Sequence, residues 1–400
     1  MKIIYISGAI PFHENLRGTT ALPYHLMVHR NRDITIEIYS YNSNRLTEKQ
    51  IQQVEQELNV KIHVVKRYGF LIGIIEQFLF LRILLKYPYL YHQKLAKNIV
   101  DEINKKRPDG IWVYGEEMDR VVRQFPRYKR IHTFPDCESL YYYRLLRLHF
   151  VVSNWKQYMR ALFMMPKYMR MERDCCQDAT VLHHLVGDMD LQMFKSLHPK
   201  SNAIFLRHPH YDIYPLKKDV SFSCPKIKLL ITGQNNIYMH EGVKEMIDAF
   251  VENNEYSKSL TSSYEITFLG KGWENETKQL RAIGFPTNHL QYAEIYVEEI
   301  RKYDVQLSPI VIGTGTKGKV LDALANGLLL IGTPFALENV AVENMVSCVE
   351  YHSGSELIKI LLDIKGNKTM YEDIARKGRD MIMTLHSRKL LSSELFKFYE

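Results

Sequence analysis

The sequence of 400 residues has few cysteines, and none of them follows a spacing typical of a metal site. The five are Cys137, Cys175, Cys176, Cys224 and Cys348, an odd number that includes one adjacent pair. Adjacent cysteines suit neither a zinc site nor an ordinary disulfide, so we interpret all five as reduced thiols. This pattern excludes a disulfide-stapled secreted domain and favours a cytoplasmic location.

Familiar targeting patterns are also lacking. The first ten residues, MKIIYISGAI, lead directly into a strand-like pattern without the apolar length or cleavage site of a signal peptide. Residues 68–85 have roughly the length of a membrane span, but Glu76 and Arg82 interrupt them away from the ends. We expect a helix packed on a sheet here, with a transmembrane helix the least favoured interpretation. The alternative is an interfacial helix whose cations meet lipid phosphates, namely Lys66, Arg67, Arg82 and Lys86.

The excess of positive charge requires a partner. Lys and Arg outnumber Asp and Glu by 53 to 45, which gives a formal net charge of +8. Nucleic acid, an anionic membrane surface and a phosphorylated small molecule would each match this excess. Because the basic residues are spread along the chain and no helix-turn-helix, zinc or single-strand-binding motif is present, we expect no nucleic acid partner.

Short apolar runs alternate with helical patterns in two successive series. In the first half, strand-like runs lie at 2–8, 34–42, 61–67, 110–115 and 179–186, and helical patterns start at Thr19 or span 47–58 and 69–106. In the second half, strand-like runs lie at 226–233, 264–272, 304–310 and 328–333, and helical patterns at 241–253, 274–283 and 316–326. Alternation of this kind predicts parallel sheets covered by helices on both faces.

The fold class predicted from these series is α/β, with two Rossmann-like αβα domains that face a central cleft. We expect an N-terminal domain at 1–205, a linker rich in proline and charge at 206–226, and a C-terminal domain at 227–380. A helix at about 380–400 is expected to pack back on the first domain. Ligands of such sheets bind at the carboxyl ends of the strands.

Residues 304–333 carry the most informative motif, a strand followed by a glycine-rich loop and a helix. Glycines before a helix let backbone N–H groups approach a phosphate, and the helix dipole favours its negative charge. Lys317 and Lys319 add positive charge in the first turn, where lysine is otherwise unfavourable. Asp322 lies roughly 8–9 Å beyond Thr316 along the helix axis, a reach that suits the two hydroxyls of a ribose when the diphosphate lies at the helix start.

This motif resembles the signature of the "glycosyl transferases group 1" family, whose members are retaining GT-B enzymes that use nucleotide sugars. The positions that match the family variant G-x-G-x-K-x-K-x-x-[DE]-A-[LM]-A-x-G are Gly313, Gly315, Lys317, Lys319, Asp322, Ala323, Leu324, Ala325 and Gly327. The resemblance implies that Asp322 binds the ribose of the donor. Thr314 stands where the family has its first acidic residue, so that contact to the sugar is absent or made differently.

The resemblance covers about residues 226–340, again with departures from the family pattern. Where Arg and Lys usually clamp the diphosphate, this sequence has Gln234 and either His240 or Glu241. Residues 266–272 resemble the family's G-x-G element, and Asp304 with Val305 match its next strand. The donor-binding residues that the resemblance implies are Gly8, Arg17, Gly18, Gly233, Gln234, His240, Thr314, Gly315, Thr316, Lys317, Lys319 and Asp322.

The N-terminal half resembles the family more loosely. Residues 7–20 resemble the loop after the first strand, which lies under the donor phosphates. His132 falls where a family histidine approaches the transferred sugar, and Asp136 would orient it or contact the acceptor. The resemblance thus implies His132 and Asp136 as catalytic residues, whereas the alternative for His132 is a histidine satisfied within a strand.

Two further patterns are interpreted as structural. Asp188 and Asp190 form the D-x-D that binds metal in the other glycosyltransferase fold, but here they follow a strand and open a helix, so we expect one of them to be an N-cap. His183 and His184 are adjacent in a strand, so one should point into the core and the other to a face. We therefore expect neither a bound metal nor a cofactor.

The predicted function is metal-independent transfer of a sugar from a UDP- or GDP-sugar to a saccharide or lipid-linked saccharide, in surface polysaccharide or glycoconjugate synthesis. The expected location is cytoplasmic, with peripheral attachment to the inner face of the membrane as an extension. Gln234 and Thr314 favour the main alternative, a non-catalytic GT-B-like scaffold of a polysaccharide-synthesis complex. An epimerase or phosphorylase of the same fold is a second enzyme hypothesis. The base, the sugar, the acceptor, the stereochemical outcome and the oligomeric state stay open.

Overall fold

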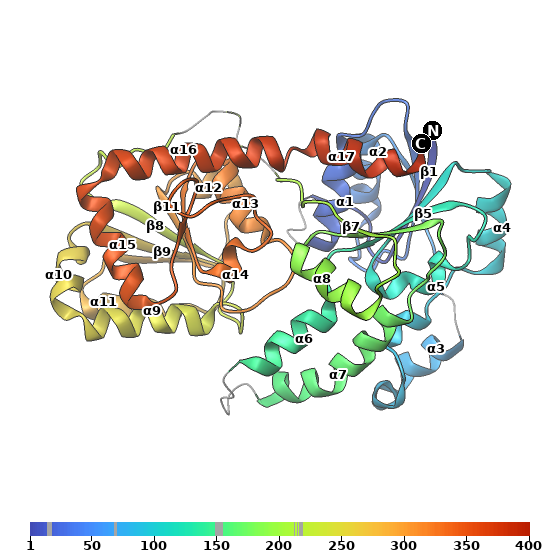
Figure 1. Ribbon diagram of the computed structural model, residues 1–400, viewed down its shortest axis with the longest axis horizontal. Coiled ribbons are helices and arrows are strands. Elements are labelled where there is room, and N and C mark those ends of the chain that lie inside the picture. The colour runs from blue at the N-terminus through green and yellow to red at the C-terminus, as the bar shows by residue number, and fades with distance from the viewer. Residues whose placement is uncertain (14–17, 68–69, 149–154, 212, 214, 216–218) are drawn as a thin grey trace. The chain divides into compact units, whose positions relative to one another are not determined.

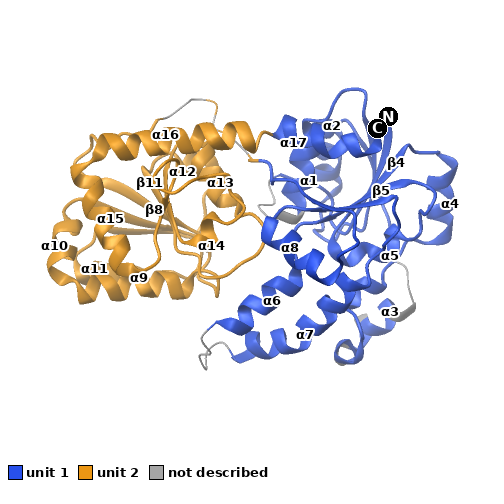
Figure 2. Ribbon diagram, in the orientation of Figure 1, with its two compact units in different colours: residues 1–209, 388–400 blue, residues 210–387 orange. Residues whose placement is uncertain are grey.

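The computed structural model describes residues 1–13, 18–67, 70–148, 155–211, 213, 215 and 219–400 (Figure 1). The chain forms two compact units (Figure 2). Unit 1 consists of Met1–Pro209 and Arg388–Glu400, and unit 2 consists of His210–Ser387. The chain therefore passes from unit 1 to unit 2 within the segment interpreted as a linker, and returns to unit 1 near its end.

Unit 1 is built on a parallel sheet, which in the described residues has the strand order β3-β2-β1-β4-β5-β6-β7. Every residue of β4 is buried, as a parallel sheet covered by helices on both faces requires. The strands are β1 (Lys2–Ser7), β2 (Thr35–Ser40), β3 (Lys61–Val64), β4 (Gly110–Tyr114), β5 (Lys129–Phe134), β6 (Val181–Leu185) and β7 (Ala203–Phe205). The sheet extends one strand beyond the run at 179–186 that ends the predicted series.

One helix of unit 1, α2, begins with a local signal that the sequence carries. In α2, the Thr47 side chain accepts a hydrogen bond from the Gln50 backbone N–H, and the Gln50 side chain accepts one from the Thr47 N–H, a capping box. The helices are α1 (Gly18–Val28), α2 (Glu48–Leu58), α3 (Phe70–Gln77), α4 (Lys97–Lys105), α5 (Asp119–Val122), α6 (Glu138–Arg147), α7 (Trp155–Arg173), α8 (Asp188–Leu197) and α17 (Arg388–Phe396). Short 3-10 turns are η1 (Leu79–Leu84), η2 (Tyr89–His92), η3 (Glu116–Met118) and η5 (Lys397–Tyr399).

The helical pattern predicted at 69–106 is wrong as a continuous element. The structure divides it into α3, η1, η2 and α4, and Pro88 is the N-cap of η2. Proline lacks a backbone N–H and disfavours helix at the residue before it, so a single helix cannot continue through this point. Among the described residues, no helix is long and apolar enough to cross a membrane.

Unit 2 repeats the architecture with the strand order β10-β9-β8-β11-β12-β13 in its described residues, again parallel throughout. Its strands are β8 (Ile227–Thr232), β9 (Tyr264–Leu269), β10 (Thr287–Leu290), β11 (Val305–Ser308), β12 (Leu329–Gly332) and β13 (Val349–Glu350). Its helices are α9 (His240–Glu252), α10 (Asn254–Thr261), α11 (Glu274–Ile283), α12 (Tyr296–Ile300), α13 (Gly318–Ala325), α14 (Pro334–Leu337), α15 (Gly354–Gly366) and α16 (Lys368–Leu385).

The end of the chain belongs to unit 1, where α17 and η5 complete the core. The Ser392 hydroxyl donates to the Leu26 carbonyl at 2.7 Å, and the Tyr399 hydroxyl donates to the Ile111 carbonyl at 2.7 Å. The Tyr399 ring lies so close to β4 that a Cβ on Gly110 would be 2.2 Å from it. The segment that packs on unit 1 is therefore 388–400, whereas α16 stays in unit 2.

Candidate functional site

The glycine-rich loop of unit 2 lies at the carboxyl end of β11 and leads into α13. Its conformation depends on Gly315, which has a left-handed φ of +58°. The Gly315 carbonyl accepts hydrogen bonds from Lys317 Nζ at 3.1 Å and Asn339 Nδ2 at 2.8 Å, and Lys317 Nζ also donates to the Thr314 carbonyl at 2.9 Å. Lys317 was predicted to contact phosphate. Its side chain instead folds back and holds the loop that precedes it. Asn339, which lies 24 residues further along the chain, also holds the loop through the Gly315 carbonyl. No sequence motif around Asn339 predicts this role.

The carboxyl ends of β8 and β9 approach each other at the same edge of the sheet. Gly233 and Gly270 both have positive φ, +136° and +145°. A Cβ on Gly270 would lie 2.0 Å from the Gly233 carbonyl oxygen, a distance that no side chain can occupy. A Cβ on Gly233 would lie 4.0 Å from Lys319 Nζ, so the lysine reaches from α13 to the end of β8. Gly233 and Lys319, both predicted as donor-binding, are therefore brought together.

Lys319 is exposed to solvent, yet the surrounding protein desolvates its ammonium group and lowers its pKa. Solvent exposure and a lowered pKa are both expected for a side chain in a surface recess, because water reaches the recess while protein atoms surround the ammonium group. The nearby Asp322 carboxylate opposes this shift. An anionic ligand in the recess would also favour the charged form of Lys319 and raise its pKa.

Asp322 is nearly buried. It is the fifth residue of α13 and 5% exposed, and its charge adds to the burial that raises the pKa of the neighbouring Tyr296 hydroxyl. A ribose would therefore meet only a small accessible part of this residue. The two threonines of the loop, Thr314 and Thr316, are half-buried.

The positions predicted to clamp the diphosphate lie between β8 and α9. Gln234 is exposed, and His240 is the first residue of α9. His240 Nδ1 lies 2.9 Å from Asn235 Oδ1 and 3.6 Å from Glu276 Oε1, while Asn235 Nδ2 donates to the Gly272 carbonyl at 2.8 Å. Asn235 therefore orients His240 and ties it to the loop after β9. The positions predicted to clamp the diphosphate thus carry a polar network around one histidine, where the family pattern has Arg and Lys.

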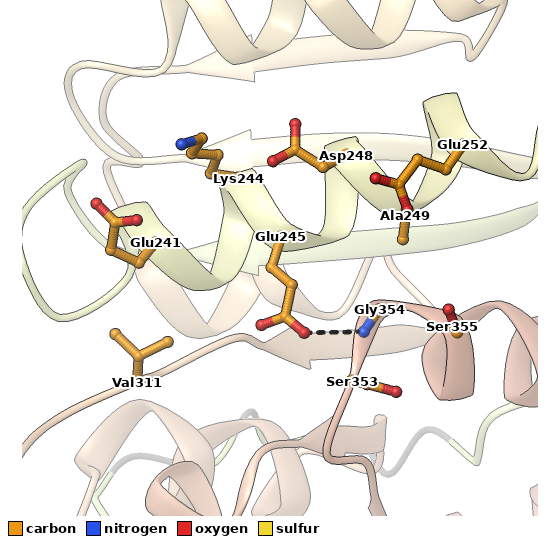
Figure 3. A pocket seen from close by; sticks show the side chains of 10 residues that line it. All are labelled: Glu241, Lys244, Glu245, Asp248, Ala249, Glu252, Val311, Ser353, Gly354 and Ser355. Atoms are coloured by element: carbon orange, nitrogen blue, oxygen red, sulfur yellow. Dashed lines mark hydrogen bonds between the residues drawn. The ribbon is translucent and has the colours of Figure 1, made fainter. Parts of the chain in front are cut away.

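A pocket of about 440 Å³ lies elsewhere in unit 2, along the flank of α9 (Figure 3). Four acidic residues line it on the helix, and the carboxylate of one of them, Glu245, accepts a hydrogen bond from the Gly354 N–H at 3.1 Å. The four are Glu241, Glu245, Asp248 and Glu252. Because these carboxylates would repel a diphosphate, this pocket is not a candidate for donor binding.

In unit 1, the predicted loop residues after β1 are only partly described. Gly8 follows β1, and its carbonyl accepts a hydrogen bond from the Ser43 N–H at 3.0 Å. Arg17 lies outside the described residues. Gly18 is the first residue of α1. Gly8 thus follows the carboxyl end of β1, and Gly18 opens α1.

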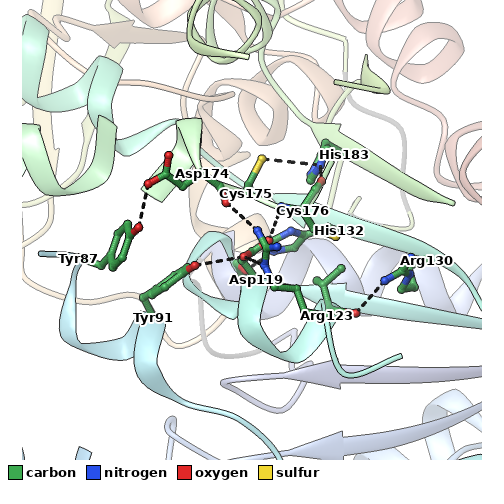
Figure 4. Close-up of polar contacts among 12 residues, drawn as sticks. Tyr87, Tyr91, Asp119, Arg123, Arg130, His132, Asp174, Cys175, Cys176 and His183 are labelled. Carbon is green, nitrogen blue, oxygen red and sulfur yellow. Dashed lines mark hydrogen bonds and ion pairs between the residues drawn. The ribbon is translucent and has the colours of Figure 1, made fainter. Parts of the chain in front are cut away.

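The structure places His132 inside β5 and fully buried, which differs from the predicted approach to a transferred sugar. Its Nε2 lies 2.9 Å from the Gly115 carbonyl, and burial lowers its pKa, so the neutral ring donates this bond. Figure 4 shows the imidazole beside Asp119 and His183. The strand continues to Phe134, so His132 lies two residues inside it rather than at its end. This geometry is that of a buried strand histidine with one ring nitrogen hydrogen-bonded and Nδ1 without a partner among the described residues, and it gives the catalytic role no support.

Asp136 lies in a different setting, an acidic recess at the carboxyl ends of β4 and β5. Glu116 and Glu117 follow β4, and Asp136 and Glu138 follow β5. Burial, with the neighbouring carboxylates, raises the pKa of Glu138 to about 8, and burial raises that of Glu117 to about 7. The pKa of Glu116 is also raised, by burial first and then by Glu138. The Tyr168 hydroxyl from α7 donates to Glu117 at 2.8 Å.

These raised pKa values predict that the acidic recess destabilises the fold as pH rises. Between about pH 4.5 and 8 the folded protein binds more protons at Glu138 than the unfolded chain does, so the free energy of unfolding falls with increasing pH. Replacing Glu138 with Gln removes this ionisation. The melting temperature of the variant relative to the wild type should therefore rise steadily from pH 5 to pH 8.

Glu394→Gln, at an exposed position of α17 in the same unit, is the control. Its melting temperature should follow that of the wild type at every pH. If Glu138→Gln gave a pH-independent difference, Glu138 would not titrate in this range.

The two patterns interpreted as structural are buried or held within the fold. Gly187, not an aspartate, is the N-cap of α8, with Asp188 as the first helical residue; the buried Asp190 accepts a hydrogen bond from the Cys137 N–H at 2.8 Å. The N-cap expected at Asp188 or Asp190 is thus wrong by position, because the strand leads into the helix through Gly187. His183 and His184 are both buried, since helices cover both faces of the sheet. In the described residues, no group of three His, Cys, Asp or Glu side chains could hold a metal ion.

No model of a protein family matches the chain, and no curated protein matches it. Solved structures do. HepE of Anabaena, in complex with UDP, is similar over 99% of this chain and 99% of its own, with a TM-score of 0.65 and 11% identity. Sucrose-phosphate synthase of Thermosynechococcus elongatus is similar over 100% and 98%, with a TM-score of 0.66 and 9% identity. The apo form of WaaB, a lipopolysaccharide outer core galactosyltransferase, is similar over 99% and 100%, with a TM-score of 0.62 and 10% identity.

The chain has the GT-B fold. The predicted fold class, α/β with two Rossmann-like domains, is thereby confirmed. At identities near 10% the likeness concerns the fold alone. In unit 2, the glycine loop and Lys319 lie at the carboxyl ends of the strands together with the ends of β8 and β9. In unit 1, the carboxyl groups of the acidic recess also lie at the carboxyl ends of strands.

Proposed function

We propose that this protein is a glycosyltransferase that moves a sugar from a UDP- or GDP-sugar to a saccharide or lipid-linked saccharide acceptor. The observation that carries the proposal is the placement of Lys319 in a recess beside Gly233, next to the glycine loop that starts α13. The fold supports it, because similar structures were solved with UDP and with UDP-glucose.

In the proposed reaction, the nucleoside diphosphate leaves the sugar with negative charge on its terminal phosphate. Backbone N–H groups at the start of α13 and the Lys319 ammonium would stabilise that charge, and the helix dipole would add to it. Gly233 and Gly315 supply the positive φ values that turn the chain at the carboxyl end of β8 and at the start of α13. Because the N–H groups and the Lys319 ammonium are already positive, the proposed site works without a metal ion.

We place the acceptor at the acidic recess of unit 1. Asp136 keeps the acceptor role given to it by the sequence, now with Glu116, Glu117 and Glu138 around it. These carboxyl groups can accept hydrogen bonds from sugar hydroxyls when ionised and donate them when protonated. We further propose that the anomeric configuration is retained, as in the group 1 family, although Thr314 replaces the family's acidic residue at the donor.

The proposed location is the cytoplasm, at the inner face of the membrane where a lipid-linked acceptor is available. The rival function, a scaffold that binds a polysaccharide-synthesis complex without catalysis, rests on Gln234 and Thr314 at two positions that are charged in the family.

Slow hydrolysis of the donor in the absence of acceptor tests catalysis directly. We expect the purified protein to release UDP from UDP-glucose, or GDP from a GDP-hexose, at the same rate with and without EDTA, because the positive groups at the diphosphate belong to the protein. Release is measured by coupled detection of the free nucleoside diphosphate.

The Lys319→Met variant should release far less nucleoside diphosphate than the wild type. Binding of UDP or GDP without any release would favour the scaffold. Activity that disappears in EDTA and returns with manganese would contradict the metal-independent site.

A further inference from the structure

Helix α7 carries its large apolar side chains on the side that faces solvent. Trp155, Met159, Leu162 and Phe163 are each between 40% and 54% exposed. Their spacing of i, i+4, i+7 and i+8 places them on one face of the helix. The opposite face packs on the fold through buried residues such as Ala161 and Met171. The solvent-facing side of a surface helix is usually polar, whereas that of α7 is apolar. An exposed apolar surface of this kind marks an interaction site.

A second exposed apolar segment is attached to the same helix. Lys167 of α7 donates from Nζ to the carbonyl oxygens of Arg82 and Ile83, at 2.5 and 3.0 Å, and so holds the end of η1 against the helix. Ile83 and Leu84 there are 65% and 78% exposed. Two separate parts of the sequence thus expose apolar side chains on elements that are joined to each other in unit 1.

The exposed charges of α7 itself are all positive. The exposed charged side chains of α7 are Lys156, Arg160, Arg170 and Arg173, and its acidic residue, Glu172, is buried. Lys86, whose side chain is 61% exposed, follows η1, and Asp174, directly after α7, forms ion pairs with both Lys86 and Arg173. An apolar face that starts at a tryptophan and has more cations than carboxylates at its border complements anionic lipid headgroups above hydrocarbon.

We propose that the outer face of α7, with Ile83 and Leu84, binds an anionic lipid bilayer. The proposal deepens the proposed function and rests on it for its purpose, because a lipid-linked acceptor would be presented there, but lipid binding needs neither donor nor acceptor. Of the segment at 68–85, for which an interfacial helix was the alternative, only the end of η1 takes part. In α3, Ile72 and Ile75 are buried against the fold and unavailable to lipid.

Tryptophan fluorescence gives a direct test, because the three tryptophans differ sharply in exposure. Trp112 and Trp273 are fully buried, so a change on adding vesicles reports on Trp155. With vesicles of phosphatidylcholine and phosphatidylglycerol in equal parts, emission should shift to the blue and the protein should sediment with the lipid. Vesicles of phosphatidylcholine alone should bind at least tenfold more weakly. Salt should weaken the anionic binding, since at about 1 M the Debye length is only about 3 Å.

The double variant Leu162→Glu with Phe163→Glu should reduce sedimentation with anionic vesicles at least tenfold. Its control is Val251→Glu with Tyr256→Glu, a pair of similarly exposed apolar residues in unit 2, which should bind as the wild type does. Lys156→Gln with Arg170→Gln provides a second test that leaves the apolar face intact, and it should lose several-fold. Trp155→Phe should bind normally without the spectral shift.

Equal binding by the α7 variants and the wild type, or no binding of the wild type to anionic vesicles, would overturn the proposal. A change in oligomeric state of the Leu162→Glu, Phe163→Glu variant without any vesicle binding of the wild type would assign the face to a second copy of the chain instead. UDP affinity, measured on the same samples, should be unchanged in all variants. Failure of wild-type UDP binding would count against the proposed function and leave the lipid result standing.

Discussion

Replacing Lys319 with Met should lower the affinity for a nucleoside diphosphate about ten- to a hundredfold and leave the affinity for the nucleoside nearly unchanged. The substitution keeps an unbranched apolar chain and removes only the charge beside Gly233. Hydrogen bonds to charged groups are worth about 1.5–3 kcal/mol, which corresponds to this change in dissociation constant. Calorimetric titration with UDP and uridine, and with GDP and guanosine, measures both quantities.

Two comparisons make this result specific. Lys278→Met, at an exposed position of α11, should bind both ligands as the wild type does. Asp322→Asn should weaken nucleoside and nucleoside diphosphate alike, because its proposed partner is the ribose. If Lys319→Met lost affinity equally for nucleoside and diphosphate, or lost none, the lysine would not face the phosphates.

Replacing Gly270 with Ala should destabilise unit 2 by roughly 2–5 kcal/mol and abolish nucleotide binding. The new Cβ would lie 2.0 Å from the Gly233 carbonyl oxygen, and the residue has a φ of +145° that side chains rarely adopt. Relief requires the ends of β8 and β9 to separate, which moves Gly233 away from Lys319. Chemical denaturation, together with UDP titration, measures the two effects.

Gly366→Ala is a matched control in the same unit. It lies at the end of α15, and a Cβ there would meet nothing within 4 Å. Alanine should be tolerated or slightly stabilising at this position, by a few tenths of a kcal/mol to about 1 kcal/mol. A Gly270→Ala variant as stable as Gly366→Ala would show that the two strand ends are not in contact.

Local patterns were sufficient to predict the alternating strands and helices and the glycine loop before α13. Runs such as Lys2–Ser7 and Gly110–Tyr114 are short, apolar and rich in β-branched residues, and they form buried parallel strands as expected. Gly315 and Gly233 have the positive φ values that only glycine adopts easily. These features depend on residues that are neighbours in the sequence, so they can be predicted from a single sequence.

Tertiary contacts account for what the sequence did not predict. Asn339 joins the glycine loop from 24 residues away, and Asn235 reaches both Gly272 and His240, without any motif around either asparagine. The acidic recess forms because β4 and β5 are neighbours in the sheet, which brings Glu116 to Glu138. Such residues are recognised only from contacts that form in the folded protein between segments distant in the sequence.

His132 is a different case, a match to a motif at a residue that the fold buries within a strand. Its neighbours in sequence fit the family element, but β5 continues two residues further, so the ring turns inward to the Gly115 carbonyl. The length of a strand depends on its partners β4 and β6, and these lie about 20 and 50 residues away in the sequence. A pattern of six residues could not predict this.

Amide hydrogen exchange with and without nucleotide tests the central claim, that unit 2 holds a nucleoside diphosphate at the edge formed by the glycine loop. With saturating UDP, GDP, dTDP or ADP in separate experiments, we predict that at least one ligand slows exchange in residues 233–240, in 270–272 and in 311–322, while α15 and α16 are unchanged. The Lys319→Met protein should show a weaker effect in the same segments. No protection of 311–322 by any of the four nucleotides, or protection confined to unit 1, would contradict the account.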